Sequence, residues 1–279
     1  MHLPMHHPGD DRPAQNQTSR FLLAWRDIVE GLRRYWMWVI LAQQDIRLRY
    51  RGSILGPFWV TVSTAIMVAA MGVIYPRLLN VGTAEYVPYL AIGMVIWSFL
   101  SALMNDACQT FIGAAQIIQQ VKIPLSTHAY RVVLRNLISF AHSLVVIPVV
   151  MIGFGVPARW DIILTLPALA LLAVNGVWIS VLLGMLSARF RDIPPIVGNA
   201  LTVVFFITPV FWHVEALGPL QWIERLNPFY GMVDILRAPL IGVSPSLSSW
   251  AMVVGVTVFG STATFALFAR YRPRIVFWI

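Results

Sequence analysis

Six long apolar runs without a single Asp, Glu, Lys or Arg recur along the chain, separated by short polar segments. At 1.5 Å per helical residue, such runs are suited to crossing a hydrocarbon layer about 30 Å thick. Backbone groups find no water there, so the runs are predicted to be helices. The sequence therefore predicts an all-α polytopic membrane protein with six transmembrane helices, within residues 52–76, 86–105, 136–158, 162–188, 193–214 and 250–269.

The first apolar run follows directly on a basic segment. Arg47, Arg49 and Arg51 end abruptly, and the next 25 residues carry no formal charge. Arginines beside an apolar run mark a membrane boundary and also the side from which the helix starts. Residues 47–59 are therefore interpreted as the point where the chain passes from an interface into the bilayer.

An amphipathic helix is predicted just before this boundary, over residues 19–46, with Ser19 as a candidate N-cap. An apolar aromatic face and an arginine-rich face favour a helix lying in the membrane interface, and a soluble helix packed on another domain is the alternative. Residues 1–18 are polar, lack the apolar core of a signal peptide, and are predicted to form a disordered cytoplasmic tail.

Three segments between the apolar runs are too polar to span a membrane. Residues 106–124 are amphipathic and carry four glutamines and a lysine before a proline, and residues 189–193 form a short charged turn. Residues 215–237 mix charges with apolar residues, which predicts short helices that dip into the membrane. Pro148, inside the third apolar run, predicts a kink.

Composition agrees with a membrane protein. The 279 residues are 58% hydrophobic and only 11% charged, where a soluble domain carries about 25% charged residues. The net charge of +8 comes from basic residues beside the apolar runs, where they meet anionic headgroups, so no nucleic-acid partner is predicted. The one cysteine, Cys108, excludes an internal disulfide and a thiolate metal cluster.

The distribution of basic residues predicts the orientation. Six spans place both termini on one side, and 16 of the 20 Lys and Arg residues then lie on that side. The other four are Arg77, Arg159, Arg225 and Arg237. Because basic residues are retained in the cytoplasm, both termini are predicted to be cytoplasmic.

The sequence lacks the residues needed for ATP hydrolysis, ion-driven transport and metal-dependent catalysis. No G-x-x-x-x-G-K motif occurs, so the chain is not expected to hydrolyse ATP alone. The apolar runs hold no paired carboxylates and no H-E-x-x-H, which argues against an ion-driven carrier and an intramembrane metalloenzyme. Asp106 is interpreted as a solvated helix end. His142, Asn136 and Asn175 either contact a substrate or form hydrogen bonds between helices.

Five short motifs, in this order, resemble the ABC-2 type permeases, and among them the exporters of O-antigen, capsule and teichoic acid polysaccharides. The resemblance covers about residues 20–275. The motifs are Arg49-Tyr50-Arg51 with Leu55-Gly56-Pro57-Phe58-Trp59, Val121-Lys122-Ile123-Pro124, Arg189-Phe190-Arg191-Asp192-Ile193, Pro209-Val210-Phe211-Trp212 and Leu226-Asn227-Pro228-Phe229.

The resemblance implies the permease subunit of an ATP-driven exporter rather than an enzyme, with residues 47–275 as its transmembrane domain. It implies a homodimer with two copies of a separate ABC ATPase, on which ATP and Mg²⁺ bind, so that no cofactor or metal is expected in this chain. It further implies a multi-pass protein of the plasma (inner) membrane that moves a polyprenyl-diphosphate-linked polysaccharide.

The resemblance also implies roles for particular residues. Coupling to the ATPase is expected at Gln116, Gln119, Lys122, Arg189, Arg191 and Asp192, and a gate between the fifth and sixth spans at Trp222, Asn227 and Pro228. Aromatic rings stack on sugar faces, which makes Phe58, Trp59, Phe211 and Trp212 candidates for lining a glycan channel.

A cluster of arginines at headgroup depth is a candidate site for the diphosphate of the lipid carrier. Guanidinium groups bind phosphate oxygens through charge-assisted hydrogen bonds. Attraction to anionic lipids and the setting of topology account for the same cluster equally well. Its members are Arg33, Arg34, Arg47, Arg49 and Arg51.

Three other functions are weighed against polysaccharide export. The nearest is an ABC-2 exporter of a small molecule or a lipo-oligosaccharide. An integral membrane glycosyltransferase or acyltransferase would need a histidine or carboxylate at a lipid-level cleft, for which only His213, Glu215 and Asp234 are candidates. A passive channel is the third. An ATPase encoded in the adjacent reading frame would favour the transporter.

Overall fold

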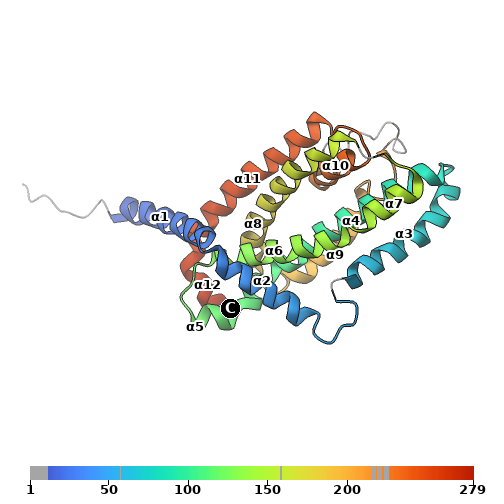
Figure 1. Ribbon diagram of the computed structural model, residues 1–279. Helices are drawn as coiled ribbons and strands as arrows, with labels where there is room; N and C mark the ends of the chain where they lie inside the picture. The colour runs from blue at the N-terminus through green and yellow to red at the C-terminus, as the bar shows by residue number, and fades with distance from the viewer. Residues whose placement is uncertain (1–11, 57, 158, 215–217, 219–221, 223–225) are drawn as a thin grey trace, which may run out of the picture.

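The computed structural model describes residues 12–279 apart from 57, 158, 215–217, 219–221 and 223–225, and these residues form helices without a strand (Figure 1). The all-α prediction is thus confirmed. The helices are α1 (Arg12–Arg33), α2 (Tyr35–Arg49), α3 (Phe58–Leu79), α4 (Thr83–Cys108), η1 (Ile112–Ala114), α5 (Ala115–Gln120), α6 (Ser126–Ser143), α7 (Val146–Phe154), η2 (Trp160–Leu164), α8 (Thr165–Arg189), α9 (Ile193–Ile207), α10 (Pro228–Leu240), α11 (Leu247–Tyr271), η4 (Arg272–Arg274) and α12 (Ile275–Trp278).

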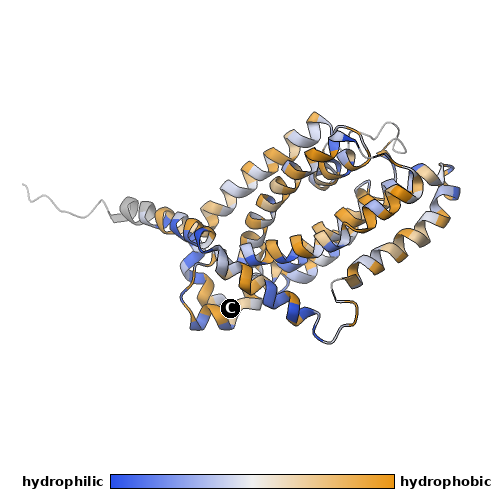
Figure 2. Ribbon diagram, viewed as in Figure 1, coloured by the Kyte–Doolittle hydropathy of each residue, from blue (hydrophilic) through white to orange (hydrophobic). Residues whose placement is uncertain are grey.

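Helix α4 is the centre of the bundle. It packs against α3, α6, α7, α8, α9 and α10, and it contributes more than a dozen buried side chains, among them the fully buried Leu90, Ile92 and Ile96. Its sequence is apolar on all faces, as expected for a helix that other helices surround. The outer helices keep apolar faces exposed, and Figure 2 shows hydrophobic residues along their length. The bundle is therefore suited to lipid rather than water.

Five segments are long and apolar enough to cross a membrane: Phe58–Leu79, Thr83–Cys108, Ser126–Phe154, Trp160–Arg189 and Leu247–Trp278. Each overlaps a predicted span. The predicted fifth span, residues 193–214, is helical only as the 15-residue α9 and then unwinds, so the structure does not confirm six full spans. The helix ends because Pro209 lacks an N–H and forces the preceding Thr208 into an extended conformation.

The third span is broken near the proline expected to kink it. Helix α6 ends at Ser143 and α7 begins at Val146. The break begins one turn before Pro148, because in a continuous helix the proline ring would clash with the carbonyl of Leu144 and could not donate a hydrogen bond to it. That carbonyl accepts from the N–H of Ile147 instead (3.0 Å). The span also begins ten residues earlier than expected, at Ser126 rather than at Asn136.

The amino-terminal helix is longer than the predicted one and is divided in two. It begins at Arg12, so Ser19 lies inside α1 and is not its N-cap, and residues 12–18 of the predicted tail are helical. Residues 1–11 lie outside the described residues. Arg34 leaves the helical conformation and separates α1 from α2. Trp25, Leu32 and Trp36 are exposed, in keeping with an amphipathic helix in the membrane interface.

A buried carboxylate attaches α1 to the bundle. The Asp27 side chain is fully buried and accepts hydrogen bonds from the backbone N–H groups of Leu125 (3.1 Å) and Ser126 (2.9 Å), at the start of α6. It also pairs with Arg272 Nε at 2.8 Å. The carboxylate caps α6 from another helix and satisfies N–H groups that have no partner within α6.

Close approach of α1 to α6 requires a glycine. A Cβ on Gly31 would collide with Ser126 Oγ, which donates a hydrogen bond to the Asp27 carbonyl at 2.8 Å. A larger residue at position 31 would therefore either displace the Ser126 hydroxyl from this hydrogen bond or push α1 away from the start of α6.

Replacing Asp27 with Asn should destabilise the protein. An amide has one acceptor oxygen instead of two and carries no charge for Arg272, so about 2 kcal/mol of stability should be lost. The measurement is the unfolding midpoint of the detergent-solubilised protein by tryptophan fluorescence. Asp192→Asn is the control, because Asp192 is exposed and should leave the midpoint unchanged. Equal midpoints for the two variants would contradict the role of Asp27.

Candidate functional site

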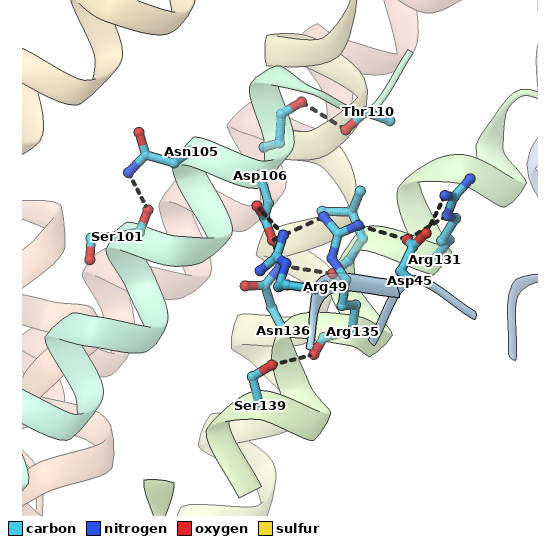
Figure 3. A network of polar contacts seen from close by, with 12 residues as sticks. Asp45, Arg49, Ser101, Asn105, Asp106, Thr110, Arg131, Arg135, Asn136 and Ser139 are labelled. Carbon is cyan, nitrogen blue, oxygen red and sulfur yellow. Dashed lines mark hydrogen bonds and ion pairs between the residues drawn. The ribbon is translucent and has the colours of Figure 1, made fainter. Parts of the chain in front are cut away.

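Asp45 ties α2 to α6 (Figure 3). Its carboxylate accepts hydrogen bonds from Arg131 Nε (2.6 Å) and Nη2 and from Arg135 Nη1 (2.6 Å). The three side chains are 11–14% exposed. Burial alone would raise the pKa of Asp45, but the hydrogen bonds and charge of Arg131 and Arg135 outweigh burial and lower this pKa below its ordinary value.

Asp106, near the end of α4, joins the same network. Its carboxylate accepts from Arg49 Nη2 (2.9 and 3.1 Å) and from Asn136 Nδ2 (3.0 Å), and it pairs with Arg135 Nη2 at 2.9 Å. Burial would lower the pKa of Arg49, but the Asp106 charge raises it. Arg135 contacts both Asp45 and Asp106, so one ionic network joins α2, α4 and α6 (Figure 3).

One sequence interpretation is corrected by this network, and one pairing was missed. Asp106 is not a solvated helix end, because three side chains surround it and it is only 17% exposed. The pairing had a sequence signal that our reasoning missed, since Asp45 and Arg49, and Arg131 and Arg135, are each four residues apart and so share a helix face. What the sequence does not show is that the two faces meet.

The five arginines predicted at headgroup depth fall into two groups. Arg34 pairs with Glu30 and Arg49 with Asp106. Arg33, Arg47 and Arg51 are exposed, and within the described part of the chain no carboxylate pairs with them. Arg33, Arg47 and Arg51 are therefore the guanidinium groups best placed to meet anionic headgroups.

The two segments predicted to couple to the ATPase, residues 106–124 and 189–193, lie around the carboxyl terminus. Together they are called the two charged segments. Gln116, Lys122, Arg191 and Asp192 are exposed. Gln119 on α5 donates to the carbonyl of Ile279 (3.3 Å), and the guanidinium of Arg189 at the end of α8 lies over the Trp278 ring at 5.2 Å. Helix α12 contacts both α5 and α8. The chain end, which sequence reasoning left out, connects both segments.

Buried apolar residues fix these segments to one another. The fully buried Ile275 packs in one cluster with Ala24 of α1, Phe111 and Leu125 beside α5, and Met185 near the end of α8. The amino-terminal helix, both charged segments and the chain end therefore form one packed unit, and movement of one segment is resisted by the others.

Comparisons with known proteins identify the family of this chain. The family model of the ABC-2 type transporter matches residues 37–241. The chain is 23% identical over 204 residues to the O-antigen export system permease protein RfbA of Myxococcus xanthus, covering 72% of this chain and 78% of that protein. It is also 23% identical over 197 residues to the RfbA protein of Klebsiella pneumoniae, with 70% and 76% covered.

The chain belongs to the ABC-2 type transporter family. It is a multi-pass membrane transport subunit, as its sequence predicted, and the family implies partnership with an ABC ATPase. In this permease the match extends from α2 to the end of α10, so it includes the ionic network and both charged segments.

The four aromatic residues predicted to line a channel in this permease do not come together. Phe58 and Trp59 begin α3, and the Phe58 ring contacts His142 edge-on (5.3 Å between centroids). Phe211 instead packs on Tyr75, near the other end of α3, at 5.7 Å. The 17 residues from Phe58 to Tyr75 span about 25 Å of helix. Trp212 donates to the carbonyl of Phe206 at 3.2 Å.

An unwound segment after α9 gives this permease an irregular backbone beside α4. Arg237 is buried, with 3% of the residue exposed, and its guanidinium donates to the Pro209 carbonyl (2.7 Å). The hydroxyls of Tyr86 and Tyr89 donate to the carbonyls of Phe211 (2.7 Å) and Trp212 (3.1 Å). Side chains of α4 and α10 thus supply the partners that a helix would have supplied. A Cβ on Gly93 would lie 2.5 Å from the Val210 carbonyl, so α4 needs a glycine there.

Two of the three residues predicted to form a gate lie at the start of α10, and the third is exposed. Asn227 caps α10 by accepting from the N–H groups of Phe229 (3.0 Å) and Tyr230 (3.3 Å), and it donates to Thr208 Oγ1 at 2.9 Å. Pro228 is the first helical residue, where no N–H is needed. Trp222 is exposed, and most of its neighbours lie outside the described residues. Asn227 therefore holds α10 to the unwound segment.

Asn175 and Asn136 act between helices, one of the two alternatives left open by the sequence. Asn175 Nδ2 donates to Thr257 Oγ1 (2.7 Å), which links α8 to α11, and Asn136 links α6 to Asp106 of α4. The Nδ1 atom of His142 lies 2.7 Å from the Ile138 carbonyl of its own helix, while the ring contacts Phe58 of α3.

Replacing Asp45 with Asn should destabilise the permease at neutral pH by about 3 kcal/mol, because the largely buried Arg131 loses its counter-charge and Arg135 keeps only Asp106. Since folding lowers the pKa of Asp45, the stabilisation is present above the ordinary carboxyl pKa and is lost as the pH falls through the lowered folded pKa. The unfolding midpoints of wild type and D45N, measured from pH 7 downward, should therefore converge in acid.

Glu30→Gln is the matched control for D45N. It also removes a carboxylate from an arginine pair, but the Glu30 and Arg34 side chains are 49% and 42% exposed. Exposed pairs contribute at most about 1 kcal/mol. A D45N effect no larger than that of E30Q would show that the Asp45 pairs contribute no more than a surface ion pair.

Proposed function

We propose that this permease exports a polysaccharide linked to a polyprenyl diphosphate carrier across the plasma membrane, with energy from ATP hydrolysis on a separate subunit. The observation that carries the proposal is the similarity, over about 70% of the chain, to two proteins named O-antigen export system permeases. The chain contains no phosphate-binding loop of its own, which is consistent with a separate ATPase.

The ATPase is proposed to dock on the face formed by α5, the turn after α8 and α12. Gln116, Lys122, Arg191 and Asp192 provide exposed polar and charged groups there. These groups lie at the tips of the spans and are attached to them by the packed unit around Ile275, so a push on the tips would be transmitted to α8 and α6.

The channel is proposed to form between two copies of the permease, bordered by α3 and α9. Both helices have exposed apolar residues, including Ile66 and Ile74 on α3 and Val203 and Phe206 on α9. The gate at the outer end of this channel is proposed to be formed by Asn227 and Pro228, at the start of α10, and by Trp222. Arg33, Arg47 and Arg51 are proposed to attract the carrier diphosphate, and the excess of basic residues on the same side supports cytoplasmic termini.

Deleting the gene should cause a lipid-linked polysaccharide to accumulate inside the cell. The measurement is extraction of polyprenyl-linked glycans from deleted and complemented cells, with surface glycan assayed in parallel. Loss of surface polymer together with its accumulation on the carrier is the expected result. Unchanged lipid-linked glycan with loss of a secreted small molecule would favour the small-molecule exporter instead, and loss of polymer synthesis without accumulation would favour a membrane enzyme.

Replacing Trp278 with Ala should weaken the coupling of ATP hydrolysis to export. Its ring contacts Arg189, a contact worth about 1 kcal/mol, which corresponds to about a fivefold change in the equilibrium that keeps α12 on the end of α8. Transport per ATP hydrolysed should fall, by at most this factor. The measurement is ATPase activity and export in reconstituted vesicles that contain permease and ATPase.

Phe277→Ala is the control for W278A. It removes an aromatic ring from the same short helix, but Phe277 is 85% exposed. A W278A protein with the coupling ratio of F277A would contradict the role given to the chain end.

A further inference from the structure

A polar cavity lies beside the ionic network. Its volume is about 130 Å³, and it is bounded by the end of α4, η1 and the first turns of α6. Arg49, Arg131, Arg135 and His128 line it, and Asp106 is the one carboxylate among its lining residues. The neighbouring lining residues Gln109 and Gly113 are exposed, so the cavity opens on the side of η1.

Two groups in the cavity wall lack a hydrogen-bond partner. The His128 side chain is fully buried, and neither of its ring nitrogens is paired within the described part of the chain. The same holds for Nε of Arg135. An unpaired buried donor or acceptor costs about 1–3 kcal/mol, so an occupant with polar atoms is expected between these groups.

Charge selects the kind of occupant. Three guanidinium groups face one carboxylate in the cavity wall, and Asp45, which pairs with Arg131 and Arg135 from α2, is the second carboxylate of the network. The network is therefore positive by one charge when His128 is neutral, and it repels a metal cation. Water would satisfy His128 and Arg135 but would leave this charge uncompensated.

We propose that this cavity binds a small oxyanion of the phosphate class. Phosphate oxygens accept from guanidinium N–H groups and from an imidazole N–H, which are the donors that Arg135 and His128 present. The volume is several times the 30 Å³ or so that a water molecule occupies, enough for one phosphate group. The occupant is free phosphate or the phosphate of a lipid headgroup, since the cavity adjoins Arg49 at the boundary of the first span.

An oxyanion here would lock together segments that the proposed transport cycle must move. The cavity wall takes Arg49 from α2, Asp106 from α4, and His128 and Arg135 from α6, and η1 beside it leads into α5. Binding would hold these elements at one separation. The cavity is present whatever the permease transports, and phosphate binding can be measured without transport.

The test is isothermal titration of the purified, detergent-solubilised permease with sodium phosphate, against sodium chloride of equal ionic strength. Saturable binding of phosphate and none of chloride is expected. Arg49→Gln, at the exposed edge of the cavity, should weaken binding about tenfold. Arg191→Gln is the control, because it removes the same charge from an exposed position outside the cavity. Unfolding midpoints in chloride establish that each variant is folded.

Two results would overturn the proposal. One is a phosphate titration of wild type that matches chloride, which would mean a cavity filled with water only and needs no variant to interpret. The other is equal weakening by R49Q and R191Q, which would mean general surface attraction. Two further titrations identify the source once phosphate binds. Tighter binding of geranylgeranyl diphosphate than of pyrophosphate would assign the site to a lipid headgroup, and equal affinity would assign it to a free anion.

Discussion

A charge that leaves water must have a counter-charge, and this constraint determines how the helices of the permease meet at one end of the bundle. Asp45 and Asp106 lie between three guanidinium groups from α2 and α6, and Arg135 contacts both. Separating any of these helices would leave a largely buried ion alone, at a cost of several kcal/mol. The interface helix is therefore held to α4 and α6 by charge, while apolar packing around α4 holds the spans to one another.

The same end of the molecule unites segments that are distant in sequence. Asp27 caps α6 and pairs with Arg272, a residue 245 positions away, and α12 reaches back to both charged segments. Because the contacts are tightly packed, with Gly31 against Ser126, small displacements at the tips cannot be absorbed locally. The arrangement suits a subunit that receives force at its tips and passes it to its spans.

The sequence predicted the membrane spans, which depend on hydropathy. It did not predict features that depend on contacts between distant parts of the chain. Runs of uncharged residues located five spans, because exclusion of charge from hydrocarbon is a local rule. The unwinding after Ile207 was not predicted, although Pro209 signals it, because an apolar sequence continues to Val214. The pairing of Asp106 with Arg49, 57 residues away, depends on how helices pack, which no spacing in a single sequence reveals. The roles of the site residues remain predictions for the same reason.

The unwound segment also bears on the proposed orientation. Arg237 was counted among the four basic residues on the sparsely charged side, yet its guanidinium is buried against the Pro209 carbonyl and the Tyr89 ring. A residue that completes the backbone hydrogen bonds of a broken helix is retained for that purpose and says little about topology. By the same reasoning Arg131 and Arg135, which are largely buried against Asp45, also say little about topology. Without these three arginines, 14 basic residues remain on the proposed cytoplasmic side and three on the other, so the bias persists. The break that shortens α9 thus weakens the count of six spans, on which the placement of both termini on one side depends.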